Sequence, residues 1–302
     1  MKTALVVCGA TATGKTALAV ECAKRLDGEV VSCDALLVYR GLNIGTAKPT
    51  RVEMGGIPHH LIDVVEPWEQ FSVSDFERLA LPVIDDILER GKTPVLCGGT
   101  GFYLNALLYK STFGDTPAAP EIRRKYEKIA EEEGREALHA RLRAVDPESA
   151  EKLHYNDVKR VVRALEIYEA TGKKKSDQHD EPIPRFPFLA VAYDYPREVL
   201  YERIDRRVDN MLEAGLVAEV EALLASGVPE NAQCMQGIGY KEVVEALKNG
   251  SVHSTMSDII KQNTRNYAKR QLTFFKRMQN LRFITPKPLE LAAQEVIALY
   301  DD

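Results

Sequence analysis

The stretch GATATGKT, from Gly9 to Thr16, decides the fold of this chain. It fits the phosphate-binding pattern in which a glycine and four free positions precede Gly-Lys-Ser/Thr. The apolar run Ala4–Cys8 before it predicts a buried strand, and Thr16–Leu26 after it predicts a helix. The glycines let backbone N–H groups turn toward an anion, while the lysine and the helix N-terminus add positive charge. The stretch therefore predicts a phosphate site, but it does not indicate which phosphate compound is bound.

Apolar runs alternate with helix-like segments along much of the chain. Glu29–Asp34, Pro94–Gly98 and Phe188–Tyr193 predict three further strands, and Phe71–Arg90 predicts a helix between two of them. Strands that alternate with helices form a parallel sheet with crossover connections. From Pro196 onward the sequence predicts helices again.

The segment between Pro120 and Thr171 is charged and has helical periodicity. It predicts three helices, at Ile122–Glu133, Arg135–Ala144 and Asp157–Ala170, and Asp146-Pro147 marks a break among them. We therefore expect an α/β fold with a P-loop NTPase-like parallel sheet core. In this interpretation residues 1–115 and 186–302 form the core, and residues 116–185 form a helical insertion domain.

The composition limits the class of protein. Of 302 residues, 45% are hydrophobic and 28% are charged, and the formal net charge of −5 leaves room for local basic patches only. The five cysteines form no CxxC pair, so neither a disulfide framework nor a zinc site is expected. Cys8, Cys33 and Cys97 end strand-like runs, which predicts that they pack in the core. Without a long apolar run or a signal pattern, we expect a cytoplasmic protein with no membrane partner, and a monomer.

Two turns after predicted strands carry candidate chemistry. Asp34 ends the second strand, at the edge of a parallel sheet that faces the ligand crevice. Its carboxylate can hold Mg²⁺ through water, act as a base, or simply cap the turn. Thr100 lies in the turn Gly98–Gly101, where glycines allow either close approach of a ligand or merely a tight turn. Thr16 is the expected hydroxyl ligand of Mg²⁺.

Basic clusters suggest a polyanion in spite of the negative net charge. Lys159, Arg160 and Arg163 lie at helical spacing in the insertion. Lys261–Arg282 contains seven Lys and Arg residues, no Asp or Glu, and interleaved aromatic residues. On a helix this segment presents a positive side, which is either a face for a polyanion or a solvated surface.

Two smaller groups complete the candidate residues. Arg203 and Arg207 are four positions apart and share a helix face, and paired guanidinium groups suit a diphosphate. The adjacent His59 and His60 point in opposite directions in a strand. Because that is poor metal geometry, we interpret the two histidines as structural.

A series of segments in chain order resembles one known family. After GATATGKT and Asp34 these are VYRGLNIGTAKPT, PHHLIDV, VLCGGTGFYLNALL, NDVKRVVRALEIYEATGK, RIDRRVDNML, QGIGYKE and TRNYAKRQLTFFKRM. They cover nearly the whole chain and resemble the tRNA dimethylallyltransferase (IPP transferase) family. The resemblance implies transfer of a dimethylallyl group from dimethylallyl diphosphate to N6 of the adenosine next to the anticodon, with release of diphosphate. It implies the tRNA anticodon stem-loop as partner and Mg²⁺ as cofactor.

The resemblance also implies roles for individual residues. Asp34 matches the general base, and Thr100 matches a residue beside the reacting centre. The residues expected at the diphosphate are Gly9, Ala10, Thr11, Ala12, Thr13, Gly14, Lys15, Thr16 and Arg207. Those expected at the tRNA are Asp34, Ala35, Leu36, Leu37, Thr100, Arg123, Lys159, Arg160, Val161, Val162, Arg163, Gln236, Gly237, Ile238, Gly239, Tyr240 and Lys241.

The chain departs from the family pattern directly after Asp34. Many members carry Ser and Gln there, whereas this chain has Ala35, Leu36 and Leu37. These positions therefore imply no side-chain hydrogen bond to a purine.

Three other functions fit part of the sequence. An adenylate isopentenyltransferase uses a free nucleotide and would not need a basic insertion. A P-loop small-molecule kinase would consume ATP and close an arginine-rich lid, which the segment from Arg123 to Arg143 resembles. A non-catalytic RNA-binding P-loop protein would tolerate the loss of Asp34.

Overall fold

The computed structural model describes residues 4–110, 119–177, 183–250 and 254–301. The chain divides into two compact units. The larger contains Met1–Leu108 and Arg185–Asp302, and the smaller contains Tyr109–Pro184. Each unit has its own apolar cluster, so each is described by itself below.

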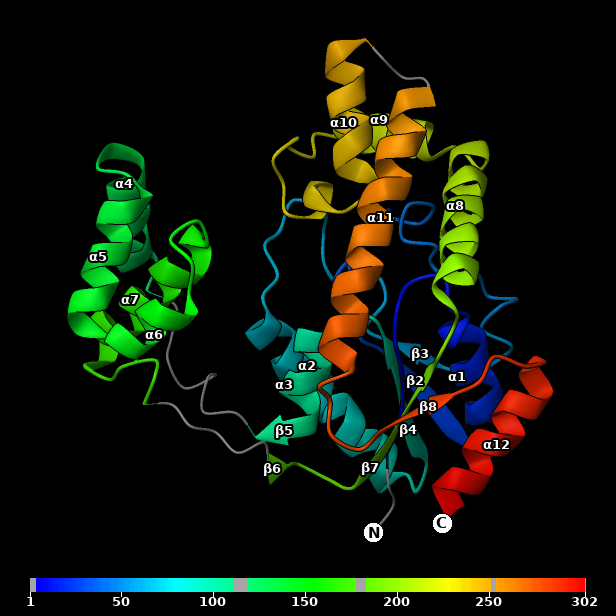
Figure 1. Ribbon diagram of the computed structural model, residues 1–302. Coiled ribbons are helices and arrows are strands. Elements are labelled where there is room, and N and C mark those ends of the chain that lie inside the picture. The colour runs from blue at the N-terminus through cyan, green and yellow to red at the C-terminus, as the bar shows by residue number, and fades with distance from the viewer. Residues whose placement is uncertain (1–3, 111–118, 178–182, 251–253, 302) are drawn as a thin grey trace. The chain divides into compact units, whose positions relative to one another are not determined.

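The larger unit is built on a six-stranded sheet with the strand order β3-β2-β4-β1-β7-β8. All neighbouring strands pair in parallel, which confirms the predicted parallel sheet (Figure 1). The central strands read as near-continuous apolar runs because both faces of the sheet are covered. The strands are β1 (Ala4–Cys8), β2 (Gly28–Ser32), β3 (His59–His60), β4 (Thr93–Gly98), β7 (Phe188–Tyr193) and β8 (Leu281–Ile284).

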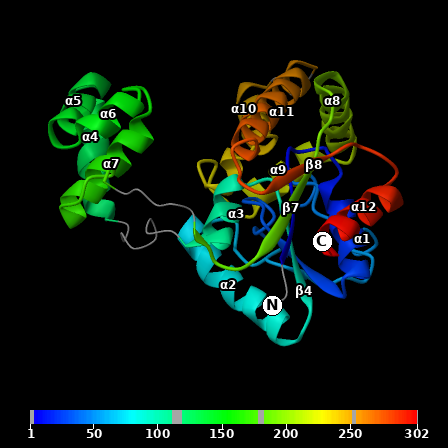
Figure 2. The same cartoon turned by 60° about the horizontal axis from the view of Figure 1, so that its bottom comes forward.

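Two pairs of helices cover the sheet, as Figures 1 and 2 show from different sides. Helices α1 (Lys15–Arg25) and α12 (Leu289–Asp301) pack together on one face, and α2 (Val73–Glu89) and α3 (Gly101–Leu108) pack on the other. The start of α2 is set locally by a capping box, in which Ser72 Oγ accepts from Asp75 N at 3.1 Å.

A group of four helices stands at one end of the sheet (Figure 1). Helix α11 packs against α8 and α10, and α9 packs against α8 and α10 as well. Their bounds are α8 (Arg197–Glu213), α9 (Leu216–Ala225), α10 (Tyr240–Asn249) and α11 (Ser254–Phe275), with the short 3₁₀ helix η2 (Cys234–Gln236) before α10.

Strand β8 corrects the prediction that only helices follow Pro196. Leu281–Ile284 pairs in parallel with β7, and Ala190 faces Leu281 in the register. The strand lies at the edge of the sheet, and of its four residues only Ile284 is buried. A short edge strand that contains a charged residue gives no apolar run, so its sequence does not reveal it.

The smaller unit is helical and begins and ends in a short antiparallel ladder. Its core is formed by apolar residues such as Leu138, Leu142, Val161 and Leu165. Its elements are β5 (Tyr109–Lys110), α4 (Pro120–Glu132), α5 (Arg135–Val145), α6 (Pro147–Lys152), α7 (Val158–Thr171) and β6 (Ile183–Pro184).

The predicted break at Asp146-Pro147 is also the start of the short helix α6, which the sequence pattern does not predict. Asp146 Oδ1 accepts from Ser149 N at 3.1 Å, and Pro147 occupies the first helical position. Burial alone would raise the pKa of Asp146, but hydrogen bonds from Ser149 and Ser176 outweigh it and hold the pKa at about 2.

The structure also bears on the expectations for the cysteines, the two adjacent histidines and membrane-spanning helices. All five cysteines are free and buried, which confirms the packing role of Cys8, Cys33 and Cys97. His60 Nε2 lies 2.8 Å from Glu29 Oε2, and no cluster of His, Cys, Asp or Glu within the described ranges could hold a metal ion. No described helix is long and apolar enough to cross a membrane.

Candidate active site

The phosphate loop joins β1 to α1 in a tightly curled backbone. Gly9 and Gly14 have φ values of 120° and 87°, and Ala12 has a φ of 63°, which a residue with a side chain rarely adopts. Lys15 Nζ donates to Ala10 O at 3.3 Å, across the loop. Arg203 Nε donates to Ala12 O at 2.7 Å, so this arginine supports the strained part of the loop.

Lys15 and Arg207 give the site its positive charge. Burial lowers the pKa of both groups, and the Arg207 charge lowers the pKa of Lys15 further. The charge of Asp34 acts in the opposite direction on both pKa values. In the described part of the chain neither cation forms an ion pair, and each donates only to a backbone carbonyl, Arg207 to Thr46 O at 3.2 Å.

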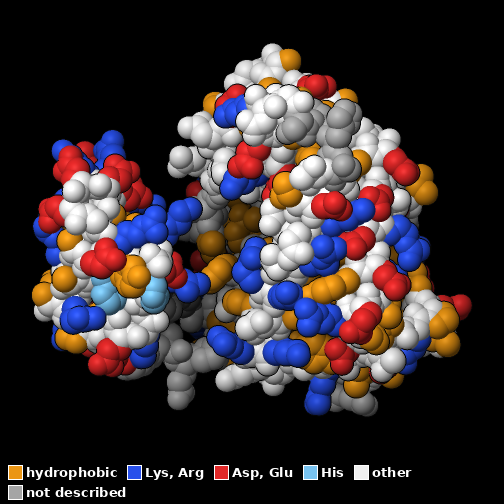
Figure 3. Space-filling model, turned by 45° about the horizontal axis from the view of Figure 1, so that its top comes forward, with side chains coloured by type: hydrophobic (Ala, Val, Ile, Leu, Met, Phe, Trp, Pro, Cys, Tyr) orange, Lys and Arg blue, Asp and Glu red, His pale blue; other side chains and the backbone are white. Residues whose placement is uncertain are grey.

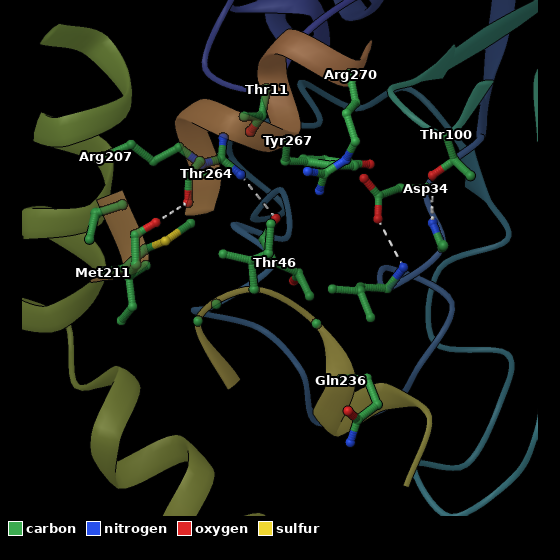
Figure 4. Close-up of a pocket in the computed structure, with 18 residues that line it drawn as sticks. Thr11, Asp34, Thr46, Thr100, Arg207, Met211, Gln236, Thr264, Tyr267 and Arg270 are labelled. Atoms are coloured by element: carbon green, nitrogen blue, oxygen red, sulfur yellow. Dashed lines mark hydrogen bonds between the residues drawn. The ribbon is translucent and has the colours of Figure 1, made fainter. Parts of the chain in front are cut away.

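Arg207 lines a cavity of about 320 Å³. Figure 4 shows Asp34, Thr100 and Arg270 on one side of it and Arg207 and Met211 on the other. The lining residues are Thr11, Asp34, Ala35, Leu36, Gly45, Thr46, Thr100, Arg207, Val208, Met211, Gln236, Gly237, Ile238, Gly239, Ile260, Thr264, Tyr267 and Arg270.

Asp34 caps its turn and also faces the cavity. Its Oδ1 accepts from Leu36 N at 2.9 Å and from Leu37 N at 3.4 Å. The other carboxylate oxygen accepts no hydrogen bond from a described residue, so it is available to a ligand. Thr100 Oγ1 accepts from Ala35 N at 3.1 Å, which ties the Thr100 turn to the Asp34 turn.

The segment from Gln236 to Lys241 is divided between the cavity and its support. Gln236–Gly239 line the cavity, whereas Tyr240 is buried and Lys241 is exposed. Tyr240 Oη donates to Glu219 Oε1 at 2.6 Å. Lys241 lies in α10 and pairs with Glu245 at 3.8 Å.

Residues that were not individually expected at the site also contribute. Glu219 accepts from the backbone N–H groups of Asn43, Ile44 and Gly45, so it anchors the loop that brings Gly45 and Thr46 to the cavity. Thr264, Tyr267 and Arg270 recur every three positions on α11 and line the cavity together. That helical spacing is a signal which the basic composition of the segment obscured.

The basic segment on α11 is partly neutralised by another helix. Lys261 pairs with Asp209 at 2.6 Å, and Arg265 pairs with Asp205 at 2.6 Å, both on α8. Figure 3 shows Lys and Arg side chains interspersed with Asp and Glu over the visible face of the larger unit. This face therefore offers local positive groups rather than a uniform positive field.

In the helical unit, the residues expected at the tRNA differ in their surroundings. Arg123 and Arg163 each lie 3.0 Å from Glu166, a fully buried carboxylate on α7. Val161 and Val162 are buried in the core of the unit, so their side chains do not reach its surface. Lys159 is exposed, and Arg160 is exposed and pairs with Asp157 at 3.1 Å.

A buried strand, a curled loop ending in Gly14-Lys15-Thr16, and a helix on a parallel sheet define a P-loop protein. Residues 37–278 match the family described as IPP transferase, and residues 1–65 match the family described as isopentenyl transferase. The chain belongs to the IPP transferase family, and the α/β fold that this family implied is confirmed.

Relatives and solved structures agree with this assignment. The chain is 47% identical over 287 residues to a tRNA dimethylallyltransferase of Acetivibrio thermocellus, covering 94% of this chain and 92% of the relative. The structure of a tRNA isopentenylpyrophosphate transferase from Bacillus halodurans matches with a TM-score of 0.74 and 40% identity, over 100% of this chain and 95% of the other. A eukaryotic dimethylallyltransferase acting on tRNA matches with a TM-score of 0.85 and 31% identity, over 100% of this chain and 79% of the other.

Proposed function

We propose that this protein transfers the dimethylallyl group of dimethylallyl diphosphate to N6 of the adenosine next to the anticodon of tRNA. The observation that carries the proposal is the pair of cations Lys15 and Arg207. Arg207 lines the cavity, its charge lowers the pKa of Lys15, and neither cation pairs with a carboxylate among the described residues. Partly buried cations are normally paired, so their arrangement favours an anionic ligand. A diphosphate in the curled loop supplies that charge, and as a leaving group it needs the same cations.

The carboxylate of Asp34 is the base in this reaction. N6 forms a bond to C1 of the dimethylallyl group while the C1–O bond breaks, and the electron pair of that bond leaves with the diphosphate. The proton from N6 passes to Asp34, whose second oxygen is not used by the turn. Thr100 keeps this carboxylate in place because it holds the backbone of Ala35. The apolar side chains of Val208, Met211 and Ile260 line the cavity and suit the prenyl group.

Mg²⁺ fits this site through few protein ligands. Thr16 is the second residue of α1, and the described residues contain no carboxylate cluster that would form a complete cage. Mg²⁺ commonly binds in this way, through one or two protein groups, water and phosphate oxygens. When bound, it would neutralise charge that develops on the leaving diphosphate. We propose that the hydroxyl of Thr16 is a protein ligand of Mg²⁺.

The tRNA contacts are proposed for both units. Around the cavity, the turn from Asp34 to Leu37, Thr100 and the segment Gln236–Lys241 would hold the extruded adenosine and its neighbours. Extruding a base costs a few kcal/mol. In the helical unit, Lys159 and Arg160 have the exposed charge that phosphate contacts need, and such contacts offset that cost. Residues 116–185 are accordingly proposed as the tRNA-contacting insertion of a catalytic core.

One experiment separates this function from its alternatives. Unmodified tRNA, dimethylallyl diphosphate and Mg²⁺ are incubated with the protein, and the digested nucleosides are analysed by mass spectrometry. We expect a prenylated adenosine in tRNA and no product from free AMP. Efficient prenylation of AMP would instead support the nucleotide-using relative, and ADP formation in step with turnover would support a kinase. Binding of tRNA without any product would support a non-catalytic protein.

A further inference from the structure

A single side chain on α11 bridges two of the loops at the cavity. Gln271 Oε1 accepts from Thr11 N in the phosphate loop at 2.9 Å, and Gln271 Nε2 donates to Gly99 O at 2.9 Å. The side chain is only 5% exposed. A carboxamide can accept and donate at the same time, which neither a carboxylate nor a hydrocarbon chain of the same size can do.

The glycines beside Thr100 are explained by this bridge. A Cβ atom on Gly99 would lie 2.3 Å from Gln271 Nε2, and one on Gly101 would lie 2.3 Å from the ring of Phe274. Gln271 and Phe274 are three positions apart on α11 and share a face. Side chains of the protein's own helix therefore approach the glycine-rich turn closely, and a Cβ at Gly99 would displace the carboxamide of Gln271 from its bridging position.

The bridge joins the phosphate loop to the turn that carries Thr100, and the proposed reaction requires a fixed position of one relative to the other. Thr11 belongs to the loop that would hold the diphosphate, and Gly99 precedes Thr100, whose hydroxyl ties down the turn of Asp34. The bridge also occupies the N–H of Thr11, which leaves the later amides of the loop for an anion. We infer that Gln271 is a positioning residue that fixes the diphosphate loop relative to the Thr100–Asp34 turn. This inference rests on the proposed function.

The first test removes the bridge and keeps its volume. We expect Q271L to lower kcat by about 10–100-fold, because misplacement of reacting groups by about 1 Å can cost 10²-fold, while KM for tRNA stays within about twofold. Q262L makes the same change at an exposed position of the same helix and should match the wild type. A kcat of Q271L within about twofold of the wild type would overturn the inference.

The second test separates hydrogen bonding from packing. G99A alone should lower both the melting temperature and kcat, because its Cβ collides with Gln271. In Q271A/G99A the space conflict is gone, so G99A should lower the melting temperature less than it does in the wild type. The kcat of the double variant should nevertheless stay as low as that of Q271A. Recovery of kcat in the double variant would show that only packing matters and would overturn the inference.

The third test does not depend on prenyl transfer. Inorganic pyrophosphate with Mg²⁺ is titrated into the wild type, Q271L and Q262L by calorimetry. Without the hydrogen bond that orders Thr11, pyrophosphate binding should weaken by about 3–10-fold in Q271L alone, as expected for the removal of one hydrogen bond. If the wild type binds pyrophosphate but transfers no prenyl group, the proposed function fails while this result still supports the bridge. Equal pyrophosphate affinities of folded Q271L and wild type would overturn the positioning role of Gln271, whatever the outcome for the proposed function.

Discussion

Each unit of the molecule places one carboxylate near two cations, but the two arrangements differ. In the helical unit, buried Glu166 bonds directly to Arg123 and Arg163, each at 3.0 Å. In the larger unit, Asp34 acts on the pKa values of Lys15 and Arg207 through space without pairing with either. In the first set both arginines pair directly with the carboxylate, whereas in the second set neither cation pairs with Asp34. We therefore propose that the first set stabilises the fold of its unit and that the second set binds a charged ligand.

The largest effect is expected for Asp34. Asn at this position keeps an oxygen that can accept from Leu36 N, so the turn should survive, but it cannot take a proton. We expect D34N to lower the rate of prenyl transfer by about 10²–10⁴-fold with an unchanged melting temperature and tRNA affinity. Single-turnover rates, melting curves and tRNA binding would be measured on one preparation. A near-normal rate of prenyl transfer in D34N would show that Asp34 is not the base, and the proposed difference in role between Asp34 and Glu166 would then be wrong.

The unpaired cations come next. K15M and R207M should each weaken binding of dimethylallyl diphosphate by about 10–100-fold, since a hydrogen bond to a charged group contributes about 1.5–3 kcal/mol. Neither cation has a carboxylate partner among the described residues, so removing either charge should not lower the stability of the protein. R206M, at the exposed neighbouring position of α8, is the control. Titration with dimethylallyl diphosphate and melting curves would test this prediction. A loss of stability with an unchanged affinity for dimethylallyl diphosphate would contradict the proposed role.

The paired set should behave in the opposite way. E166Q removes the charge that two arginines share, and we expect a decrease of about 2 kcal/mol in stability, because Arg123 keeps access to water. The affinity for dimethylallyl diphosphate should not change. Urea unfolding monitored by circular dichroism measures the decrease, with E131Q at an exposed position as control. Equal stability of E166Q and wild type would mean that this ion-pair set does not hold the helical unit together.

The same carboxylate predicts a pH dependence. Burial alone would raise the pKa of Glu166, but hydrogen bonds from Ala119, Arg163 and Arg123 outweigh it, so the folded pKa lies below the ordinary 4.5. A depressed folded pKa means that the stabilisation is present above pH 4.5 and is lost as the pH falls through the folded value. The difference in stability between wild type and E166Q should therefore shrink below about pH 4.5. Urea unfolding at stepped pH would test it, and a constant difference down to about pH 3 would contradict it.

The smallest effect is expected at the exposed cations of α7. K159A/R160A should weaken tRNA binding several-fold and reduce the salt slope of log affinity by about 1 for each phosphate that the variant no longer neutralises. Arg163 is left intact because it belongs to the Glu166 set. Affinity for dimethylallyl diphosphate should not change. A variant with Arg124 and Lys128 of α4 changed to Ala removes the same charge elsewhere in the unit; an equal effect of both variants would indicate only a general charge contribution.

Local patterns are sufficient for much of the fold. The strands Ala4–Cys8 and Phe188–Tyr193 have the bounds that their apolar runs predict, because buried parallel strands leave a continuous hydrophobic signal. The edge strand Leu281–Ile284 and the short helix Pro147–Lys152 escape prediction, because few of their residues are buried. Elements that bury little surface leave little trace in the sequence.

The site shows the same limit in another form. The phosphate loop, Asp34 and Thr100 can be identified because glycine turns after strands are local features. The partners of Arg123 and Arg265 cannot, because they lie far away in sequence. Glu166 is 43 residues from Arg123, and Asp205 is 60 residues from Arg265. Gln271 meets Thr11 across 260 residues. A basic residue therefore looks the same in the sequence whether the fold neutralises it or leaves it for a ligand.

The burial of the five cysteines has a consequence for labelling chemistry. Burial raises the pKa of Cys8 and Cys22 to about 12 and that of Cys97 to about 11, so almost no thiolate forms at neutral pH. Alkylating reagents attack the thiolate and need access to it. Modification must then wait for the structure to open, and its rate at each cysteine reports how often that part of the sheet, of α1 or of η2 becomes exposed. The chain thus carries its own probes of local opening, from the end of β1, which leads into the phosphate loop, to η2, which precedes the cavity-lining segment Gln236–Gly239.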